Sequence, residues 1–556
     1  MSTETKPARP RGLALLRAAL GTRKAGAMLA FGFSSGLPYA LLLGTVSVWL
    51  DDLKIDLKTI GVLSWVGLCY SFKFLWSPGV DRLRLPLLGR LGRRKSWILL
   101  CQLTIIPALL GLAMTDPAHA LGRFALFALV AALASATQDV AVDAWRIDVA
   151  DAETPVELLS AIYQFGYRTA SIVGGAFALV LAARMAWGTV FAIMAGLMLV
   201  VALITARAPD APRPLADPLN EELSQPGAIV PAVRGAALVV VAAAWLWAIS
   251  RIGRFMTSVL GQLPPGVKPP SAVEFTRSNG AWIVAATVVV PLGMATLMNW
   301  LQARGRYVLV AADPVRSPAR VAMNHLYGAL IAPLAELVAR LRWGVLIVIG
   351  MILSYQLVFS IWATFALPFY QKIGYSKDEI AFASKLFGIF MTMLGVSIAG
   401  YLFARIGRIR TLLVGAVVPI FGNLIYADLA GGGASLDALG NALGLGWLAQ
   451  SLGYDPKLTR LLMAIVYENI ATGIAGASFV AYVSGIVSRR YTAVQYALLS
   501  SLTFLIGSLA RGLAGEWFDI YGYAPVFRGT ALVGLIAVGF VLLEWLRMAR
   551  NPQVEG

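Results

Sequence analysis

The sequence is poor in the residues from which catalytic and metal centres are most often built. It has only two histidines, His119 and His325, and two cysteines, Cys69 and Cys101. Two histidines exclude a multi-histidine metal or haem site, and the cysteines have neither metal-ligand spacing nor an extracellular disulfide pattern. No nucleophile–base pair or phosphate-binding glycine loop stands out either. We therefore predict no metal, no cofactor and no enzymatic activity.

Charged residues are scarce as well, and they are unevenly distributed. They make up 13% of the 556 residues, whereas 58% are hydrophobic and the mean hydropathy is +0.74. A soluble protein carries roughly 25% charged residues. The net charge of +17 would suit a nucleic acid partner, but the basic residues lie in short loops between apolar runs. That distribution is typical of a multi-pass protein of the lipid bilayer, and we expect no nucleic acid binding.

Apolar runs of about the 20 residues that a membrane-spanning helix needs follow one another along the chain in groups of six, two and six. They lie near 27–50, 59–80, 96–114, 121–145, 158–183, 186–206, 234–256, 280–301, 343–370, 379–404, 410–429, 459–487, 493–515 and 525–547. We predict an N-terminal six-helix half (1–206), a linker with a transmembrane hairpin near 234–301 and a basic segment (207–342), and a C-terminal six-helix half (343–556). The first run is too long for a signal peptide, so we expect it to stay as a span.

Basic residues favour one side of these spans. Arginine and lysine fill the loop after the second span of each half and close the chain, whereas acids such as Asp51, Asp116 and Asp455 lie in the loops on the other side. Because basic loops stay in the cytoplasm, both termini are predicted to be cytoplasmic.

The loop after the second span has a similar pattern in both halves. Residues 79–82 (GVDR), followed by 92–94 (GRR), resemble the loop motif of the major facilitator superfamily, with a short insertion. Residues 400–408 (GYLFARIGR) resemble its degenerate second copy, in which Ala404 replaces the acid. Two copies at matching positions predict an all-α transporter of the major facilitator fold, built from two repeats.

An aspartate among arginines at this position is expected to act as a charged latch at the cytoplasmic mouth. The predicted cytoplasmic gate consists of Asp81, Arg82, Arg93, Arg94, Arg146, Arg405 and Arg408.

Five segments resemble the AmpG muropeptide permeases more closely: 32–50, 58–82, 135–149, 467–482 and 493–502. These permeases carry peptidoglycan breakdown products across the bacterial inner membrane, and the wider branch includes acetyl-coenzyme A transporters. The resemblance implies proton-driven import of anhydromuropeptides, which are disaccharide-peptides, by alternating access. We expect a monomer. The resemblance does not cover the hairpin, and 355–359 (YQLVF) stands where close relatives carry a lysine and an aspartate, so no role of those charges is transferred.

Two alternatives stay open on the sequence. Another bulky anion, such as acetyl-coenzyme A, would suit the same fold. A membrane enzyme or lipid scramblase would use the same kind of cavity, but the paired latch motifs disfavour it.

Polar side chains at membrane depth are few, and they form the candidate site. A charge there costs at least ~2.5–3.5 kcal/mol, so it normally faces a bundle interior or a water path. With no histidine in the spans of the two halves, a proton carrier there must be a carboxylate. We predict proton coupling at Glu468 and Asp139, with Asp143 in reserve. Substrate contacts are expected from Gln138, Asp139, Gln164, Tyr167, Arg168, Lys385, Asn469 and Arg511.

Several of these charges have an alternative interpretation. Asp143 and Arg146 equally suit a structural ion pair, Glu468 suits a buried acid hydrogen-bonded to a neighbouring span, and Lys73 is expected to snorkel to the membrane surface. Asp139 lies ten residues before the loop near 149–157 and Arg168 eleven after it, so the two are at similar depth and are predicted to pair.

Overall fold

The computed structural model describes residues 20–55, 64–83, 85–86, 88–209, 222–260, 272–313, 317–380, 383–384, 387–451, 453 and 455–550. Within these ranges the chain is helical, apart from turns, short connections and one isolated antiparallel bridge between Ile229 and Val308. Eleven of the described helices are long and apolar enough to cross a membrane, or twelve if one bent pair forms a single span. An all-α membrane protein is therefore confirmed, while the count of fourteen spans stays a prediction.

The first six predicted spans form one bundle. Its elements are α2 (Arg23–Ala40), η1 (Leu41–Thr45), α3 (Val46–Asp52), η2 (Ser64–Gly67), α5 (Leu68–Phe72), η3 (Lys73–Leu75), α6 (Ser77–Arg82), η4 (Leu88–Leu91), α7 (Arg93–Ala113), α8 (Pro117–Asp148), α9 (Val156–Ser171), η5 (Ile172–Phe177), α10 (Ala178–Ala182) and α11 (Trp187–Arg207). Trp49 lies in its apolar core, with its ring centroid 5.1 Å from that of Phe124 and 5.0 Å from that of Phe191.

The last six predicted spans form the second bundle. Its elements are α18 (Gly344–Lys372), α19 (Lys377–Ile380), α20 (Gly388–Ile406), α21 (Arg408–Ala430), α22 (Ala434–Ala442), α23 (Leu445–Ser451), α24 (Pro456–Ile486), α25 (Thr492–Tyr521) and α26 (Tyr523–Arg550). The repeat extends to local detail, since α8 and α24 begin in the same way. In each, an aspartate accepts a backbone N–H, at 2.9 Å and 2.8 Å, and the following proline occupies the first turn, where its missing N–H removes no helix hydrogen bond.

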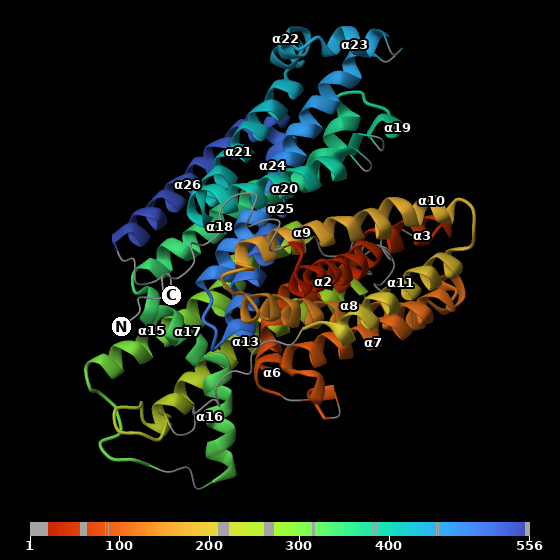
Figure 1. Cartoon of the computed structure of the whole chain (residues 1–556). Coiled ribbons are helices and arrows are strands. Elements are labelled where there is room, and N and C mark those ends of the chain that lie inside the picture. The colour runs from red at the N-terminus through yellow and green to blue at the C-terminus, as the bar shows by residue number, and fades with distance from the viewer. Residues whose placement is uncertain are drawn as a thin grey trace, which may run out of the picture.

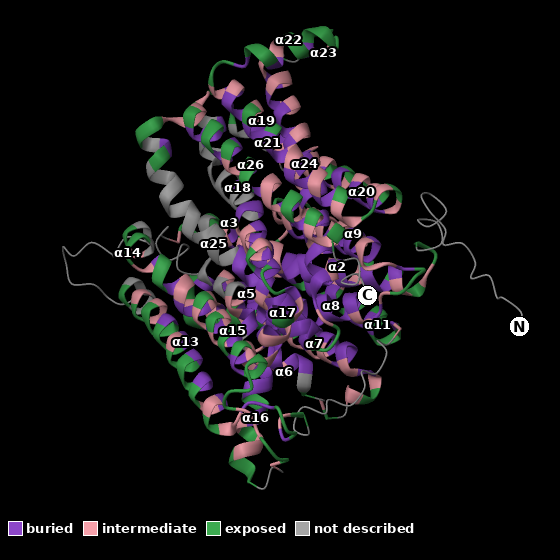
Figure 2. Cartoon of the chain, turned by 90° about the vertical axis from the view of Figure 1, so that its left-hand side faces the viewer, coloured by how far each residue is buried: buried purple, intermediate pink, exposed green. Residues whose placement is uncertain are grey.

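The linker contributes helices of its own beside the two bundles. They are α13 (Pro231–Leu260), α14 (Ala272–Val284), η6 (Ala285–Val289), α15 (Val290–Ala303), α16 (Pro318–Leu330) and α17 (Ala332–Leu341). On its inner face α13 packs against the first bundle, where the ring centroids of Trp245 and Phe74 are 5.3 Å apart. Its outer face exposes apolar side chains such as Val239 and Leu246, as expected of a surface that faces lipid (Figure 2).

Paired glycines bring two helices of each bundle into backbone contact. Gly32 on α2 and Gly166 on α9 each lie against a carbonyl oxygen of the other helix, where a Cβ would clash. Gly395 on α20 and Gly473 on α24 do the same in the second bundle. Small residues of this kind are what allow membrane helices to pack closely, since no hydrophobic force drives helices together in lipid.

The two bundles contact each other where α9 begins, α24 ends and α25 begins, and we call this the joined end. Here α9 packs against α20 and α24 through an apolar cluster that includes Leu158, Ala161 and Ala481, and α25 lies against α6 and α8. Figure 1 shows the bundles diverging from this end, with α10 at the far tip of the first and α22 and α23 at the far tip of the second.

Candidate functional site

Two carboxylates and two cations lie together inside the first bundle, and we call them the charge group. Asp143 on α8 pairs with Arg146 at 3.0 Å between Oδ1 and Nη2, and with Lys73 at 3.6 Å between Oδ2 and Nζ. Asp139 lies one turn earlier on the same face of α8. All four side chains are buried. Mutual compensation of their charges makes them tolerable at this depth.

The charge group confirms one expectation and corrects another. The predicted ion pair between Asp143 and Arg146 is present. The prediction that Lys73 snorkels to the membrane surface is wrong, because its side chain is only 5% exposed and its ammonium faces Asp143. A nearby carboxylate compensates a buried ammonium, so the side chain has no need to reach water.

Several buried oxygen atoms near Asp139 have no hydrogen bond of good geometry among the described residues, and their nearest polar neighbours belong to the same set: Ser35 lies beside Asp139, and Ser135 beside Tyr70. They are Asp139 Oδ1, Gln138 Oε1, Ser35 Oγ, Tyr70 Oη and Ser135 Oγ. The Gln138 side chain is held by its amide nitrogen, which donates to Ser34 Oγ on α2 at 3.1 Å. Buried polar groups nearly always have well-formed hydrogen bonds, so a cluster of oxygens that interact only weakly with one another indicates a surface suited to water or a polar ligand. We call these five atoms the oxygen cluster.

Four tyrosines form a row beside the oxygen cluster. The ring of Tyr39 on α2 is 5.2 Å from that of Tyr70 on α5 and 6.0 Å from that of Tyr167 on α9. Tyr163 continues the row, 6.1 Å from Tyr167. Tyrosine combines an apolar face with a polar tip, which matches a sugar ring with its own apolar face and hydroxyls.

Glu468 on α24 is the corresponding buried acid of the second bundle. It is 4% exposed, and its Oε1 accepts a hydrogen bond from Thr472 Oγ1 on the same helix at 3.3 Å. No ion pair joins Glu468 to a cation in the described part of the chain, in contrast to Asp143. The neighbouring Asn469 turns toward α20, where its Oδ1 accepts from Thr392 Oγ1 at 2.9 Å. Glu468 is thus a buried carboxylate that no described cation compensates.

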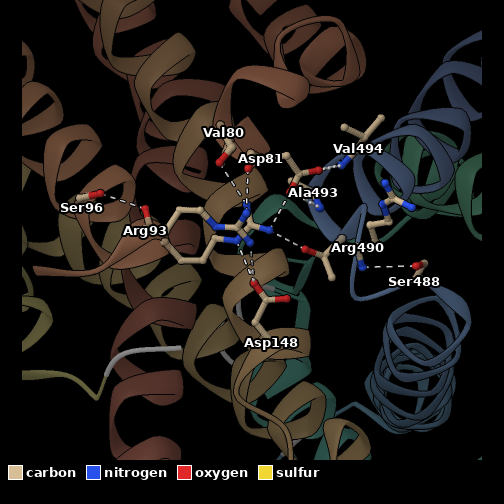
Figure 3. Close-up of polar contacts among 11 residues, drawn as sticks. Val80, Asp81, Arg93, Ser96, Asp148, Ser488, Arg490, Ala493 and Val494 are labelled. Carbon is tan, nitrogen blue, oxygen red and sulfur yellow. Dashed lines mark hydrogen bonds and ion pairs between the residues drawn. The ribbon is translucent and has the colours of Figure 1, made fainter. Parts of the chain in front are cut away.

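Asp81, at the end of α6, holds the two bundles together at the joined end. Its carboxylate accepts from Arg94 Nη2 at 2.6 Å and from the backbone N–H groups of Ala493 and Val494 at 3.3 Å and 3.0 Å (Figure 3). Those two N–H groups belong to the first turn of α25, where they have no partner within the helix. A carboxylate there also interacts favourably with the positive end of the helix dipole.

Arg94 extends this contact to two further residues. Its Nε donates to Asp148 Oδ2 at 2.9 Å, and its Nη2 donates to Thr492 Oγ1 at 2.6 Å. We call Asp81, Arg94, Asp148 and the first turn of α25 the latch. Since Arg94 is 1% exposed, these charge-assisted bonds form away from bulk water, where they are strongest.

The second bundle has a counterpart of the latch in which the acid has moved. Ala404 stands where the first motif has Asp81. A carboxylate comes instead from Glu157 in the first turn of α9, whose Oε1 lies 3.7 Å from Arg408 Nη1. In the latch the acid, Asp81, lies in the loop motif and binds the first turn of α25. In this second contact the acid, Glu157, lies in the first turn of the helix itself, α9, and the loop motif supplies only the arginine.

Arg146 connects the charge group directly to the second bundle. Its Nε and Nη2 donate to Ser484 Oγ on α24 at 3.2 Å and 3.0 Å. Its guanidinium also lies between the rings of Tyr163 and Tyr496, 5.0 Å and 5.2 Å from their centroids, which favours a cation. A change at Asp143 would therefore alter, through Arg146, the contact between the two bundles.

The loop between α8 and α9 carries another ion pair at the joined end, between Lys24 and Asp151. Partial burial would raise the pKa of Asp151, but hydrogen bonds from Lys24 and Thr154 outweigh it and lower the pKa to about 2. This carboxylate is therefore ionised at any physiological pH, and the pair is not a proton switch.

Comparison with known proteins supports this architecture. The family model "Acetyl-coenzyme A transporter 1" matches residues 27–120. The chain is 27% identical to the anhydromuropeptide permease of Escherichia coli K12, over 94% of this chain and 81% of that protein. It is 26% identical to a protein named AmpG 4 of Rickettsia conorii, over 92% of this chain and 94% of the other. The chain is thus similar over most of its length to proteins named AmpG or anhydromuropeptide permease.

Solved structures agree on the fold. The major facilitator transporter FucP, in the outward conformation, matches with a TM-score of 0.53 at 11% identity, over 93% of this chain and 98% of that one. The proton:xylose symporter XylE matches with a TM-score of 0.50 at 12% identity, over 95% of both chains. The chain is therefore a multi-pass membrane protein with the fold of the major facilitator transporters.

The structure brings many of the predicted site residues together. Gln138, Tyr167, Asp139 and Asp143 lie around the oxygen cluster and charge group, and Gln164 and Arg168 are partly buried on the same helix as Tyr167. Arg93 donates to the backbone oxygen of Asp81 at 2.8 Å, whereas Arg405 is exposed at the end of α20. Lys385 lies outside the described residues, and so do the side chains of Arg82 and Arg511.

The predicted pairing of Asp139 with Arg168 is wrong for this structure. No ion pair or hydrogen bond joins them, although both residues are described, and Asp139 Oδ1 and Arg168 Nε have no partner in the described part of the chain. Two residues at similar depth on consecutive helices pair only if their side chains also face each other, and the sequence does not show this. Lys73, from the second span, supplies the dominant compensating charge near Asp139.

Sequence reasoning missed the partners that complete these contacts. Thr492, Ser484 and Tyr496 lie on α24 and α25, more than 300 residues from the arginines they bind. The role of Asp148 could have been predicted from the sequence, because it follows Arg146 at the end of α8, on the side of the membrane where the arginines of the loop motif lie. Tyr70 carried no signal beyond its place in an apolar span.

Asp81→Asn should weaken the latch and shift the protein toward forms in which the joined end is open. A hydrogen bond to a charged group contributes about 1.5–3 kcal/mol, so we expect a shift of about tenfold or more. The readout uses the variant Ala481→Cys, which places a cysteine in the buried cluster between the bundles, in a protein without Cys69 and Cys101. We measure the rate at which a maleimide labels this cysteine. Asp116→Asn removes an exposed acid at the other end of the protein and is the control. Equal labelling rates in both variants would show that Asp81 has no latch role.

Proposed function

We propose that this transporter imports anhydromuropeptides across the bacterial inner membrane, driven by protons. One relative, matched over 94% of this chain and 81% of its own length, is named an anhydromuropeptide permease. The proposal rests on the oxygen cluster and the tyrosine row, which lie side by side inside the first bundle. Together they offer hydrogen-bonding atoms and aromatic faces, as a disaccharide with many hydroxyls requires.

The peptide part of such a substrate carries carboxylates and needs a cation. Arg168 follows Tyr167 on α9 and is partly buried, and its Nε has no partner among the described residues. We therefore assign to Arg168 the binding of a carboxylate of the substrate. Gln138 and Gln164 would bind sugar or peptide groups, and Asn469, Lys385 and Arg511 would contact the substrate from the second bundle.

Proton coupling is assigned to the acids of the two equivalent helices, α8 and α24. Glu468 forms no ion pair with any described residue, so within that part of the chain it exchanges a proton without breaking an ion pair. Asp139 belongs to the charge group, beside the oxygen cluster, so we assign it to gating or to substrate binding. Asp143 is already bound by two cations and is the third candidate.

The mechanism is rocking of the two halves around a site at their interface. In the proposed topology the joined end is cytoplasmic, with both termini on that side, because the basic loops gather there. The proposed division is that of the sequence: halves at 1–206 and 343–556, joined by 207–342 with its hairpin, giving fourteen spans in a monomer. The latch then holds the cytoplasmic mouth shut while the other ends are apart.

Uptake of a labelled anhydromuropeptide into proteoliposomes tests the function. We expect uptake above that of protein-free vesicles, increased when the outside is made acidic and abolished by a protonophore. A fluorescent phospholipid in the same vesicles reports lipid scrambling, and the chemical state of the internal label reports catalysis. Uptake no greater than in protein-free vesicles, with the protein correctly folded, would contradict the proposal.

A second candidate substrate is acetyl-coenzyme A, because the matching family model carries that name. Labelled acetyl-coenzyme A in the same vesicles separates the two. If acetyl-coenzyme A is taken up, and if it blocks muropeptide uptake fully at a concentration below that of the muropeptide, then acetyl-coenzyme A is the better substrate.

A further inference from the structure

The first turn of α25 is held on two sides. One side is the latch, where Asp81 accepts the N–H groups of Ala493 and Val494. The next residue, Gln495, is fully buried and turns toward the linker instead. Its Nε2 donates to Pro333 O at 2.7 Å and to Glu336 Oε2 at 2.6 Å, both on α17. Its Oε1 accepts the N–H of Ser488 at 2.8 Å.

The same helix of the linker also binds the end of α24. Glu336 Oε1 accepts from Arg340 Nε at 2.9 Å, and Arg340 Nη2 donates to Ile486 O at 2.7 Å. One short helix, α17, therefore fixes both ends of the connection between α24 and α25. Because an amide with all its polar atoms bonded has a single orientation, this junction determines how the first turn of α25 is presented to Asp81.

The rest of the linker is attached to the first bundle. Lys95 Nζ donates to Ala208 O at 3.0 Å at the start of the linker, and Trp245 of the hairpin packs on Phe74. The hairpin in turn is tied to α17, since Asn299 Nδ2 donates to Ala335 O at 2.7 Å. The linker thus contacts both halves on the side where the latch closes.

We propose that Gln495 and Glu336 are positioning residues of the latch, through which α17 stabilises the closed state of the joined end. They touch neither substrate nor proton carrier. They act by holding the two N–H groups of α25 where Asp81 can accept them. This rests on the latch role proposed above, and the linker becomes a third component of the gate, beside the two halves.

The test compares three variants in the Ala481→Cys labelling background. Gln495→Leu removes all three hydrogen bonds at similar size, and Glu336→Ala removes the acceptor at a partly exposed position. Glu336→Gln keeps an acceptor oxygen and should restore the parent behaviour. We expect the first two to raise the labelling rate by about twofold to tenfold, the range that one or two hydrogen bonds contribute to an equilibrium.

Transport kinetics separate positioning from a folding defect. If the closed state is less populated, the KM for external substrate rises by the same factor while the maximal rate per folded molecule is kept. A merely structural role would lower the amount of folded protein and leave KM and labelling unchanged. Glu153→Ala, an exposed acid in the α8–α9 loop, is the control.

Asp81→Asn is the reference for the latch itself. If it raises labelling while Gln495→Leu and Glu336→Ala do not, the positioning role is overturned and the latch stands. If Asp81→Asn has no effect either, the latch proposal fails first.

Discussion

Glu468→Gln should abolish the accumulation of substrate against its gradient while sparing exchange of substrate across the membrane. Glutamine keeps the size of the side chain and its hydrogen bond with Thr472, but it cannot take up or release a proton. Glu468 has no cation among the described residues, so its replacement by a neutral group unbalances no ion pair and folding is preserved. We expect accumulation driven by an acidic exterior to fall to the level of passive equilibration.

Two measurements in the same proteoliposomes check this prediction. One is the steady-state ratio of internal to external substrate under a pH gradient, and the other is counterflow of labelled against unlabelled substrate without a gradient. Glu153→Gln, an exposed acid far from the spans' interior, should behave as the parent protein in both. Normal accumulation by Glu468→Gln would move the proton site elsewhere, with Asp143 as the next candidate.

Asp139→Asn should damage accumulation and exchange together, by about tenfold or more. Asp139 contributes an unpartnered oxygen to the oxygen cluster and one of the two negative charges of the charge group. Its loss leaves Asp143 as the one acid of the charge group beside Lys73 and Arg146, and buried charges with less compensation are unfavourable. The rocking equilibrium and the binding surface are therefore both disturbed.

A second substitution separates these two effects. Lys73→Met in the Asp139→Asn background restores the balance of charge without restoring the carboxylate, since asparagine keeps one oxygen and has an NH2 group in place of the other. If the double variant regains exchange, Asp139 acts through charge balance; if it stays inactive but folded, Asp139 contacts the substrate. Asp116→Asn is the matched acid-to-amide control. Full exchange by the single variant would refute both roles.

The fold was largely predictable because its main determinants are local. Each apolar run is long enough to require a helix in lipid, and the described parts of these runs are helical. The repeated loop motif then indicated the repeat, and with it the packing of corresponding helices. Helix crossings at Gly32 and Gly395 were not predictable, since a glycine in an apolar run does not show which helix it will contact.

The site was predictable only where both partners lie on one helix. Asp143 and Arg146 are three residues apart, and the helix itself brings them together. Asp139 and Lys73 come from different spans, and their arrangement depends on how α8 rotates against η3. The Gln495–Glu336 contact depends on the path of the linker, for which no repeat or motif gave guidance.

The charge group also affects how the membrane voltage acts on the transporter. Its two acids and two bases sum to zero when all are ionised, so reorienting the first half moves no net charge from these residues. Glu468 alone would carry one negative charge, and a charge that crosses the membrane field exchanges about 2.3 kcal/mol per 100 mV. A voltage that is negative inside pushes an ionised Glu468 outward. It would therefore speed the return of the empty carrier, and leave the step with a protonated Glu468 largely insensitive to voltage.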